Sequence, residues 1–258
     1  MKKLLSILMA VALLVCLASC SKDDGNPDTP IDDVPNNNYS TADGTASFKY
    51  EITTLNEIRI VGYTGKYEQH AVTVPSEIDG IEVTEIGNQA FYYANNITSI
   101  TLPSTIKTIG DWAFAGCSYL TNVTIPDSVT EIGDGAFYKC ELLKDQKLPT
   151  SLTAIGRFTF YECTALTSIE IPTSVKTIGD SAFWGCTALT EVKGATGLTE
   201  LGGYIFNGCA ALVDVTLGES VEKIGLYAFN DCAAIQLKVT AGSYAEKYAQ
   251  DNGYTLAK

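Results

Sequence analysis

Hydrophobic and polar positions recur along this chain in one fixed order. Apolar side chains two positions apart, as at Ile100 and Leu102, predict a short strand with a single inward face. A proline such as Pro103 then ends the strand, because it has no N–H to continue a hydrogen-bonded ladder. Farther along, Phe, Cys and Leu follow one another at three-residue intervals. That spacing predicts one or two turns of α- or 3₁₀-helix with one buried side.

The order repeats every 23 residues without insertion. Its clearest column is aromatic and consists of Phe91, Phe114, Phe137, Phe160, Phe183, Phe206 and Phe229. A fixed period of this length predicts a solenoid, in which the strands of successive coils form a parallel sheet with a spacing of about 4.8 Å. A second column holds glycine from Gly87 to Gly225, always after an apolar residue. We expect these glycines to supply a turn with positive φ.

The repeat closely resembles the BspA-type leucine-rich repeat, whose pattern runs LxxLxLPxxLxxIGxxAFxxCxx, over residues 82–235. The resemblance implies an α/β repeat fold. We expect a right-handed leucine-rich-repeat solenoid with a parallel strand face and short helical or 3₁₀ turns. It also implies a secreted or lipid-anchored bacterial surface protein associated with adhesion. Gln146 replaces an apolar strand residue, while "KGATG" (193–197) and Gly218 lack the strand-closing proline. We therefore expect the strand face to become less regular toward the C-terminus.

Both ends of the repeat carry sequences suited to covering a solenoid. Residues 48–63 alternate with period two around a turn near Asn56, which predicts a β-hairpin cap. The segment "GSYAEKYAQDNG" predicts a helical cap, with Ser243 and Glu246 as a capping box and Gly253 at its end. Tyr244, Tyr248 and Ala249 should form its apolar face. The domain is thus expected to span 47–258.

The N-terminus reads as a targeting signal. Two lysines, an apolar run and small residues in 1–19 predict a lipoprotein signal peptide, and "LASC" places the lipid on Cys20. An ordinary signal peptide with an incidental cysteine is the alternative. Residues 20–46 are rich in Pro, Asp, Asn, Ser and Thr and predict a flexible acidic tether. "SKDD" after Cys20 resembles a surface-export signal, although a generic linker would look similar. We expect an outer-membrane lipoprotein, exposed at the cell surface and contacting the membrane only through its lipid.

Charge and composition exclude several function classes. The formal net charge of −13 disfavours binding to nucleic acid, because a phosphate backbone attracts basic surfaces. His70 is the single histidine, so a His-based metal site or catalytic triad has little to build on. It lies in a polar stretch and reads as a solvated loop residue. No nucleophile, phosphate-loop or dinucleotide motif is present. We expect no enzyme activity, no cofactor and no metal site.

Six cysteines occupy one column: Cys117, Cys140, Cys163, Cys186, Cys209 and Cys232. One cysteine per coil gives a row rather than the convergent pairs of a zinc site. Neighbours about 5 Å apart could form disulfides, but side chains in register point in parallel. Ala94 fills the same column in another coil. Core packing is the favoured interpretation, with disulfides and metal or redox chemistry as alternatives.

Two surfaces are candidates for binding. The residue after each column phenylalanine gives an aromatic row, with Tyr138, Tyr161 and Trp184 consecutive and Tyr92 farther off. Rings about 5 Å apart could stack on sugars or anchor a protein, although covering the core is the favoured interpretation. The strand face offers outward positions at Thr101, Thr124, Lys147, Glu170 and Lys193. Repeat proteins use such extended faces for protein recognition.

These features together predict a non-catalytic recognition protein. By resemblance, its partners are host extracellular or cell-surface proteins bound through the solenoid surface. The first alternative is a glycan-binding accessory lipoprotein that uses the aromatic row. The second is a structural or inter-cell contact protein. A fold of this kind provides the surface but does not identify the ligand.

Overall fold

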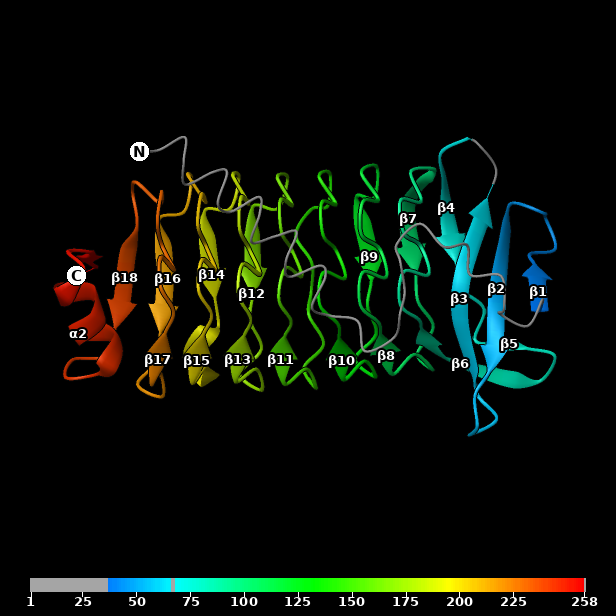
Figure 1. Ribbon diagram of the computed structural model, residues 1–258, viewed down its shortest axis with the longest axis horizontal. Helices are drawn as coiled ribbons and strands as arrows, with labels where there is room; N and C mark the ends of the chain where they lie inside the picture. Colours follow the sequence, from blue (N-terminus) through cyan, green and yellow to red (C-terminus); the bar gives the residue numbers. More distant parts are fainter. Residues whose placement is uncertain (1–36, 66–67, 258) are drawn as a thin grey trace, which may run out of the picture. The chain divides into compact units, whose positions relative to one another are not determined.

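The computed structural model describes residues 37–65 and 68–257, within a compact unit that spans Asn36–Lys258. The expected signal peptide (1–19), Cys20 and the tether up to residue 36 lie outside the described residues. The described residues wind into a parallel-strand solenoid whose successive coils stand side by side (Figure 1). The 23-residue repeat therefore corresponds to one coil, as the sequence predicts.

The coils contribute strands to two columns, except that residues 144–153 supply only an isolated bridge at Lys147 to the second column. One column holds the residues that precede the column glycines and consists of β6 (Ile81–Ile86), β8 (Thr108–Ile109), β10 (Glu131–Ile132), β11 (Ala154–Ile155), β13 (Thr177–Ile178), β15 (Glu200–Leu201) and β17 (Lys223–Ile224). The other holds the alternating strands and consists of β4 (His70–Thr73), β7 (Ile97–Thr101), β9 (Asn122–Thr124), β12 (Ser168–Glu170), β14 (Glu191–Lys193), β16 (Asp214–Leu217) and β18 (Gln236–Val239). Pairing between successive coils is parallel, with the central apolar residue of each strand buried.

The phenylalanine column forms a continuous ladder through the core. Neighbouring rings from Phe91 to Phe229 stack with centroids 5.0–5.6 Å apart, and each side chain is essentially inaccessible to water. Tyr63 stacks on Phe91 at one end of the ladder at 5.1 Å, and Tyr254 meets Phe229 edge-on at the other at 5.7 Å. Stacked rings at this separation bury large apolar areas and contribute an attraction of about 0.5–1.5 kcal/mol per pair.

The segment between each column glycine and the column cysteine, which we call the arc, is not the predicted helix. Residues 111–116 form one arc. The N–H groups of alternate arc residues form hydrogen bonds with the next coil. Trp112, Phe114 and Gly116 donate to carbonyl oxygens of the next arc, with N–O distances of 2.7–2.8 Å. The intervening residues bond locally, as Ala115 does to the carbonyl of Trp112. A helix would direct all these groups along its own axis. Stacking of the coils thus replaces half of the helical hydrogen bonds.

Positive φ falls at two arc positions rather than at the column glycine. The second and sixth arc residues are left-handed in every coil, as at Trp112 (φ 56°) and Gly116 (φ 73°). The full set is Gln89, Tyr93, Trp112, Gly116, Gly135, Lys139, Phe158, Glu162, Ser181, Gly185, Tyr204, Gly208, Tyr227 and Asp231. The expectation that the column glycines adopt positive φ is therefore wrong. Left-handed backbone costs roughly 1–2 kcal/mol per non-glycine residue, which the stacked arcs must offset.

Close approach of the coils explains the column glycines instead. A Cβ at Gly110 would lie 2.7 Å from the amide nitrogen of Asn88 and 2.9 Å from the carbonyl carbon of Gly87. Real Cβ atoms do not approach backbone this closely. The amide of Gly110 also donates to the carbonyl of Ile86 at 2.7 Å. Glycine is required here because the backbones of two coils touch.

The cysteine column packs in the core and also forms hydrogen bonds. Each thiol donates to the carbonyl of the column phenylalanine one coil earlier, with Sγ–O distances of 3.0–3.2 Å for Cys117, Cys140, Cys163, Cys186, Cys209 and Cys232. All six are free thiols in the described part of the chain. Burial raises the pKa of Cys117 to about 12, because the thiolate would lose its water. The packing interpretation fits this arrangement.

Both strand columns are interrupted at the same coil junction. Neither β9 and β12 nor β10 and β11 belong to one sheet. In the column of β9 and β12 a side chain takes the place of strand pairing: buried Gln146 accepts from the amide of Val123 at 3.1 Å and donates to the carbonyl of Lys144 at 2.8 Å. The expected loss of regularity toward the C-terminus is wrong, since β14, β16 and β18 pair in register despite η1 (Ala195–Gly197).

The N-terminal end of the coils is formed by an antiparallel hairpin. β2 (Ala46–Ile52) pairs β3 (Ile58–Gly65) around a turn at Asn56, whose φ is 57°. β3 then pairs parallel to β6, and β5 (Glu77–Ile78) pairs antiparallel to β6. β1 (Asn37–Ser40) pairs β2, so the folded unit begins before the expected boundary at 47. Its polar composition hid this strand, which packs the ring of Tyr39 against Phe48.

The C-terminal end carries the predicted helix. α2 (Tyr244–Asp251) begins at Ser243, whose hydroxyl accepts from the Glu246 amide at 3.2 Å, while Glu246 accepts from the amide of Gly242. Gly253 has a φ of 72°, as the helix end requires. Ala245 and Ala249 are the buried residues and Tyr248 packs on the core, but Tyr244 is exposed. β19 (Thr255–Leu256) then pairs β18.

Two adjacent glycines test the close-approach explanation. A Cβ at Gly202 would lie 2.5 Å from the amide nitrogen of Asp180, whereas one at Gly203 meets nothing nearer than 3.4 Å. We expect Gly202→Ala to lower the free energy of unfolding by about 2 kcal/mol or more through overpacking. Gly203→Ala should change it by less than about 0.5 kcal/mol. Urea denaturation of both variants measures the difference, and equal effects would contradict the explanation.

The thiol column predicts strong protection from alkylation. At pH 8 iodoacetamide should leave all six column cysteines unlabelled in the native protein and label all six in urea, as read by peptide mass spectrometry. Because the folded pKa values are raised, the stabilisation by these protonated thiols is complete below the unfolded pKa near 9. It should be lost as the pH rises toward the raised pKa values of the folded state, which are about 12 for Cys117 and Cys232. Rapid native labelling of several column cysteines would refute their burial.

Candidate recognition surface

The alternating strands bring the predicted strand-face residues into one row. Thr101 lies opposite Thr124, and Glu170 lies between Lys147 and Lys193 in parallel register. All five side chains are exposed, because they flank the buried central residue of each strand. We call this row, together with the outward residues on the other side of each buried centre, the strand face. Its strands lie across several consecutive coils in Figure 1.

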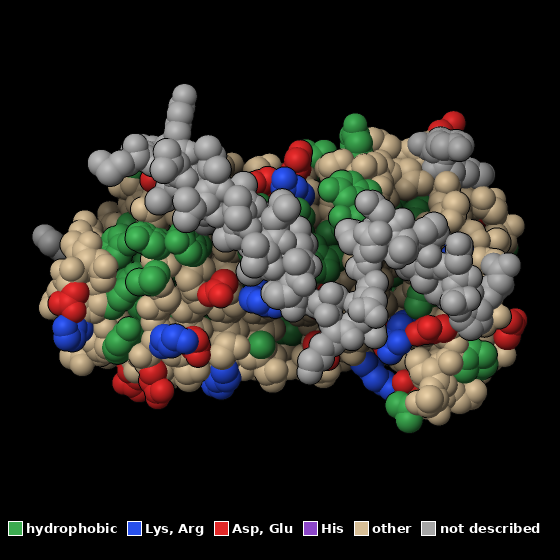
Figure 2. Space-filling model, in the orientation of Figure 1, with side chains coloured by type: hydrophobic (Ala, Val, Ile, Leu, Met, Phe, Trp, Pro, Cys, Tyr) green, Lys and Arg blue, Asp and Glu red, His purple; other side chains and the backbone are tan. Residues whose placement is uncertain are grey.

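Both lysines of the strand face are paired with nearby carboxylates. The ammonium of Lys193 lies 3.1 Å from Glu191, and that of Lys147 lies 3.7 Å from Asp127. Acidic and basic side chains accordingly lie close together on the face seen in Figure 2. Exposed pairs of this kind contribute at most about 1 kcal/mol to stability. They leave a polar surface of mixed sign, suited to contacts with a protein rather than with a strongly charged polymer.

Asp145 joins the two parts of this face across the coil junction. Its carboxylate accepts from the amides of Thr167 and Ser168, both at 2.9 Å, and from their hydroxyl groups. These bonds lower the pKa of Asp145 against the opposing effect of burial. The side chain of Asp145 thus accepts hydrogen bonds from backbone amides that a paired strand would accept elsewhere. The strand face therefore continues past the interruption.

The aromatic row forms as the repeat predicts. Tyr138 and Tyr161 stack with centroids 4.8 Å apart, and Tyr161 and Trp184 stack at 4.5 Å. The rings lie nearly parallel, within 18°. Tyr92 is not part of this stack, since its ring contacts Tyr93 edge-on at 4.6 Å. The structure therefore joins three of the four predicted aromatic residues.

Stacking leaves little ring face for a ligand. Tyr161 lies between its two neighbours and is 7% exposed. Burial raises its pKa well above the ordinary value and raises that of Tyr138 as well. The indole N–H of Trp184 is buried and has no hydrogen-bond partner among the described residues. A sugar would meet ring edges, so the row is better suited to covering the core than to stacking on a glycan.

Sequence reasoning missed part of the aromatic surface. Trp112 packs edge-on against Tyr138 at 5.2 Å, and Phe158 meets Tyr161 in the same way at 6.0 Å. Both occupy the second arc position, where positive φ turns the side chain toward the row. One sequence signal could have revealed these two residues. Each is an aromatic residue two positions after a column glycine, at a position whose positive φ suits glycine.

The single histidine is held by neighbours rather than solvated in a loop. His70 begins β4, where its Nδ1 donates to the carbonyl of Glu68 at 2.7 Å. Its Nε2 then accepts from the hydroxyl of Tyr63 at 2.9 Å. The expected loop position is wrong, because strand pairing with β7 fixes this segment. Both ring nitrogens are engaged in structural bonds.

Metal and membrane features are absent from the described part of the chain. In residues 37–65 and 68–257, no group of three or more His, Cys, Asp or Glu side chains could hold a metal ion. The same residues contain no helix that is both long and apolar enough to span a bilayer. Cys20, the predicted lipid attachment site, lies outside this region.

Comparison with known proteins identifies the repeat. The family model for the BspA type leucine rich repeat region matches residues 84–212 and 153–247, in six copies. The crystal structure of the T. pallidum leucine rich repeat protein is similar over 81% of this chain and 97% of its own, with 34% identity and a TM-score of 0.70. A leucine rich cell surface protein from Faecalibacterium prausnitzii is 23% identical over 83% of this chain and 77% of its own, with a TM-score of 0.47.

The search of curated proteins gave no match. The family match nevertheless covers more than half of the sequence, and its signature columns are the phenylalanine, glycine and cysteine columns that build the core. The chain belongs to the BspA-type leucine-rich repeat family.

Proposed function

We propose that this protein is a non-catalytic, lipid-anchored recognition protein of the bacterial cell surface. It binds host extracellular or cell-surface proteins, and the strand face is the site. The observation that carries this proposal is the pair of exposed polar rows in strand register on either side of the interrupted junction, Thr101 with Thr124 and Lys147 with Glu170 and Lys193. Leucine-rich repeat proteins commonly use extended faces of this kind for protein interaction.

The two ends of the solenoid support this role as caps. Tyr63 of the hairpin stacks on Phe91, and Tyr248 and Tyr254 of the C-terminal segment contact Phe229. These rings close the phenylalanine ladder against water, which a soluble repeat protein requires. Right-handed winding is part of the same proposal, because parallel strand crossovers are right-handed in about 98% of cases.

The glycan alternative has weaker support in the geometry. Its binding site would be the row Tyr138, Tyr161 and Trp184, whose ring faces lie against one another. The edge of Trp184 and its unpartnered indole N–H are the features that favour a sugar. A protein ligand on the strand face makes use of side chains that are already exposed.

Paired arginine substitutions test the strand face. We expect Thr101→Arg with Thr124→Arg to weaken binding to a panel of immobilised mammalian extracellular-matrix proteins by about tenfold or more, since a bulky cation would enter the contact. Surface plasmon resonance provides the measurement. The matched control is Thr130→Arg with Thr153→Arg, which adds the same charge at exposed residues outside the row, in the coil of Thr124 and in the next coil. Equal losses in both variants, or no matrix binding at all, would count against the strand face.

Two cysteines near the N-terminus provide a matched test of the anchor. Cys20→Ser should abolish incorporation of radiolabelled palmitate and shift the protein from the detergent phase to the aqueous phase. Cys16→Ser, inside the predicted signal peptide, should leave both unchanged. Antibody labelling of intact cells then reports surface exposure, which replacement of Ser21–Asp24 by alanine should reduce. Lipid labelling that survives Cys20→Ser would refute the anchor.

A further inference from the structure

The first arc of the solenoid has an open edge. In interior coils, the second, fourth and sixth residues of one arc donate their N–H groups to the first, third and fifth carbonyls of the next. Residues 88–93 form the first arc, and no arc precedes it. The carbonyls of Asn88, Ala90 and Tyr92 therefore accept no hydrogen bond from any described residue. Unpaired carbonyls at alternate residues are a site for an additional backbone segment.

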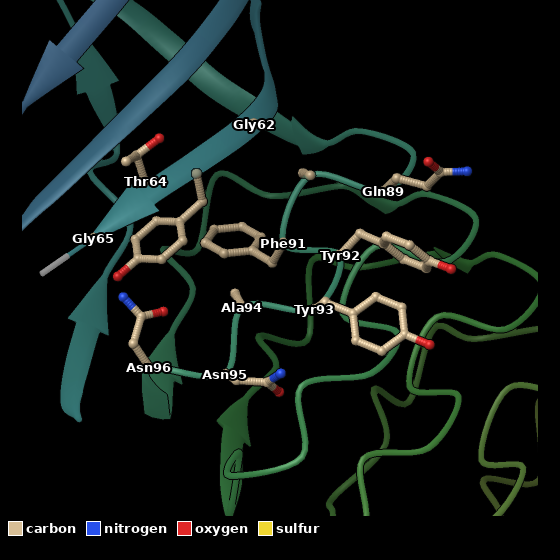
Figure 3. Close-up of a pocket in the computed structure, with 12 residues that line it drawn as sticks. Gly62, Thr64, Gly65, Gln89, Phe91, Tyr92, Tyr93, Ala94, Asn95 and Asn96 are labelled. Carbon is tan, nitrogen blue, oxygen red and sulfur yellow. The ribbon is translucent and has the colours of Figure 1, made fainter. Parts of the chain in front are cut away.

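A cavity lies beside this edge. β3 pairs β6 only as far as Ile60, and beyond that residue it separates from the first coil. The space of about 550 Å³ between residues 62–65 of β3 and the arc is shown in Figure 3. Tyr63, Tyr92, Tyr93, Asn95 and Asn96 are among the side chains around it. None of the described residues that line the cavity carries a charge, so the cavity suits a neutral hydrogen-bonding group.

The hairpin limits the occupant to a single segment. Tyr63 stacks on Phe91 at 5.1 Å and so takes the place that the ring of a preceding coil would fill. The core is closed, and only the arc edge outside it is open. The C-terminal end of a second copy presents matching free N–H groups at Tyr227, Phe229 and Asp231, but it also carries α2 and would meet the hairpin. A single peptide segment fits where a whole coil does not.

We propose that this cavity binds a single peptide segment of a partner protein, in the conformation of an arc, by backbone addition. The peptide donates three N–H groups, at alternate residues, to the carbonyls of Ala90 and Tyr92, which line the cavity, and of Asn88, which lies just beyond its lining. The rings of Tyr92 and Tyr93, which are 50% and 56% exposed, flank the peptide and contact its side chains. The site lies on a different surface from the strand face and does not depend on the proposed adhesion.

The arc geometry also predicts the sequence of the peptide. Each arc donates three N–H groups to its neighbour, from its second, fourth and sixth residues. The second and sixth of these residues have positive φ. A peptide in the same register needs residues tolerant of positive φ four positions apart. Glycine, and to a smaller extent asparagine, adopts this conformation at least cost. Ligands should therefore contain glycine or asparagine at positions i and i+4.

The experiment is selection of random nine-residue peptides displayed on phage against the immobilised protein. We expect enrichment of glycine or asparagine at i and i+4. For a selected peptide, calorimetry should show that N-methylation of residues i, i+2 and i+4 together weakens binding by about tenfold or more, because the donors are lost. N-methylation of i+1 and i+3 should have a smaller effect. Thr64→Trp, which fills the cavity wall at an exposed residue, should abolish binding, while the control Thr130→Trp should not.

Each contrary result overturns the proposal. If no peptide is enriched, or if the two N-methylation patterns have equal effects, binding by backbone addition is refuted. Binding from a glycan array that Thr64→Trp blocks, without peptide binding, assigns the cavity to a sugar. Self-association in sedimentation experiments that Thr64→Trp abolishes assigns it to a second copy. Matrix-protein binding should be unaffected by Thr64→Trp, which keeps this test separate from that of the strand face.

Discussion

The spacing between coils is the constraint on which the rest of this structure depends. Rings of the phenylalanine ladder stack at 5.0–5.6 Å, and the arcs of neighbouring coils lie within hydrogen-bonding distance of each other. At this separation there is no room for a Cβ at Gly110 or Gly202. The same spacing places each column thiol within 3.0–3.2 Å of a phenylalanine carbonyl. Glycine, cysteine and phenylalanine recur in their columns because the spacing between neighbouring coils is the same along the solenoid.

The interrupted junction shows how the coils hold together when the strands do not pair. Between β9 and β12 the ladder is replaced by side chains of Gln146 and Asp145. The arcs remain continuous there, since Gly135 and Phe137 still donate to the following arc. The phenylalanine rings also continue across, at 5.4 Å between Phe137 and Phe160. Arc bonds and ring stacking therefore provide the common framework, and strand pairing adds to it.

This framework separates residues that build the fold from residues free to serve recognition. Core columns repeat with little variation, whereas the strand face changes from Thr101 and Thr124 to Lys147, Glu170 and Lys193. An exposed strand position has no packing partner to satisfy, so its side chain can vary without loss of stability. The open carbonyls of the first arc are different, because they belong to the backbone and arise where stacking ends. Recognition by side chains and recognition by backbone thus occupy different parts of the solenoid.

The sequence by itself determined the repeat, the inward residues and the order of elements. With a 23-residue period, the same apolar positions are buried in every coil. It also predicted the stacking of Tyr138, Tyr161 and Trp184, since residues in one column meet one coil apart. Tertiary structure decided what depends on contacts between coils. Gly110 is needed for close approach rather than for its φ, the arc is not a helix, and both strand columns break at one junction, which Gln146 bridges to Val123. Each of these follows from atoms 23 residues apart, which a local pattern does not describe.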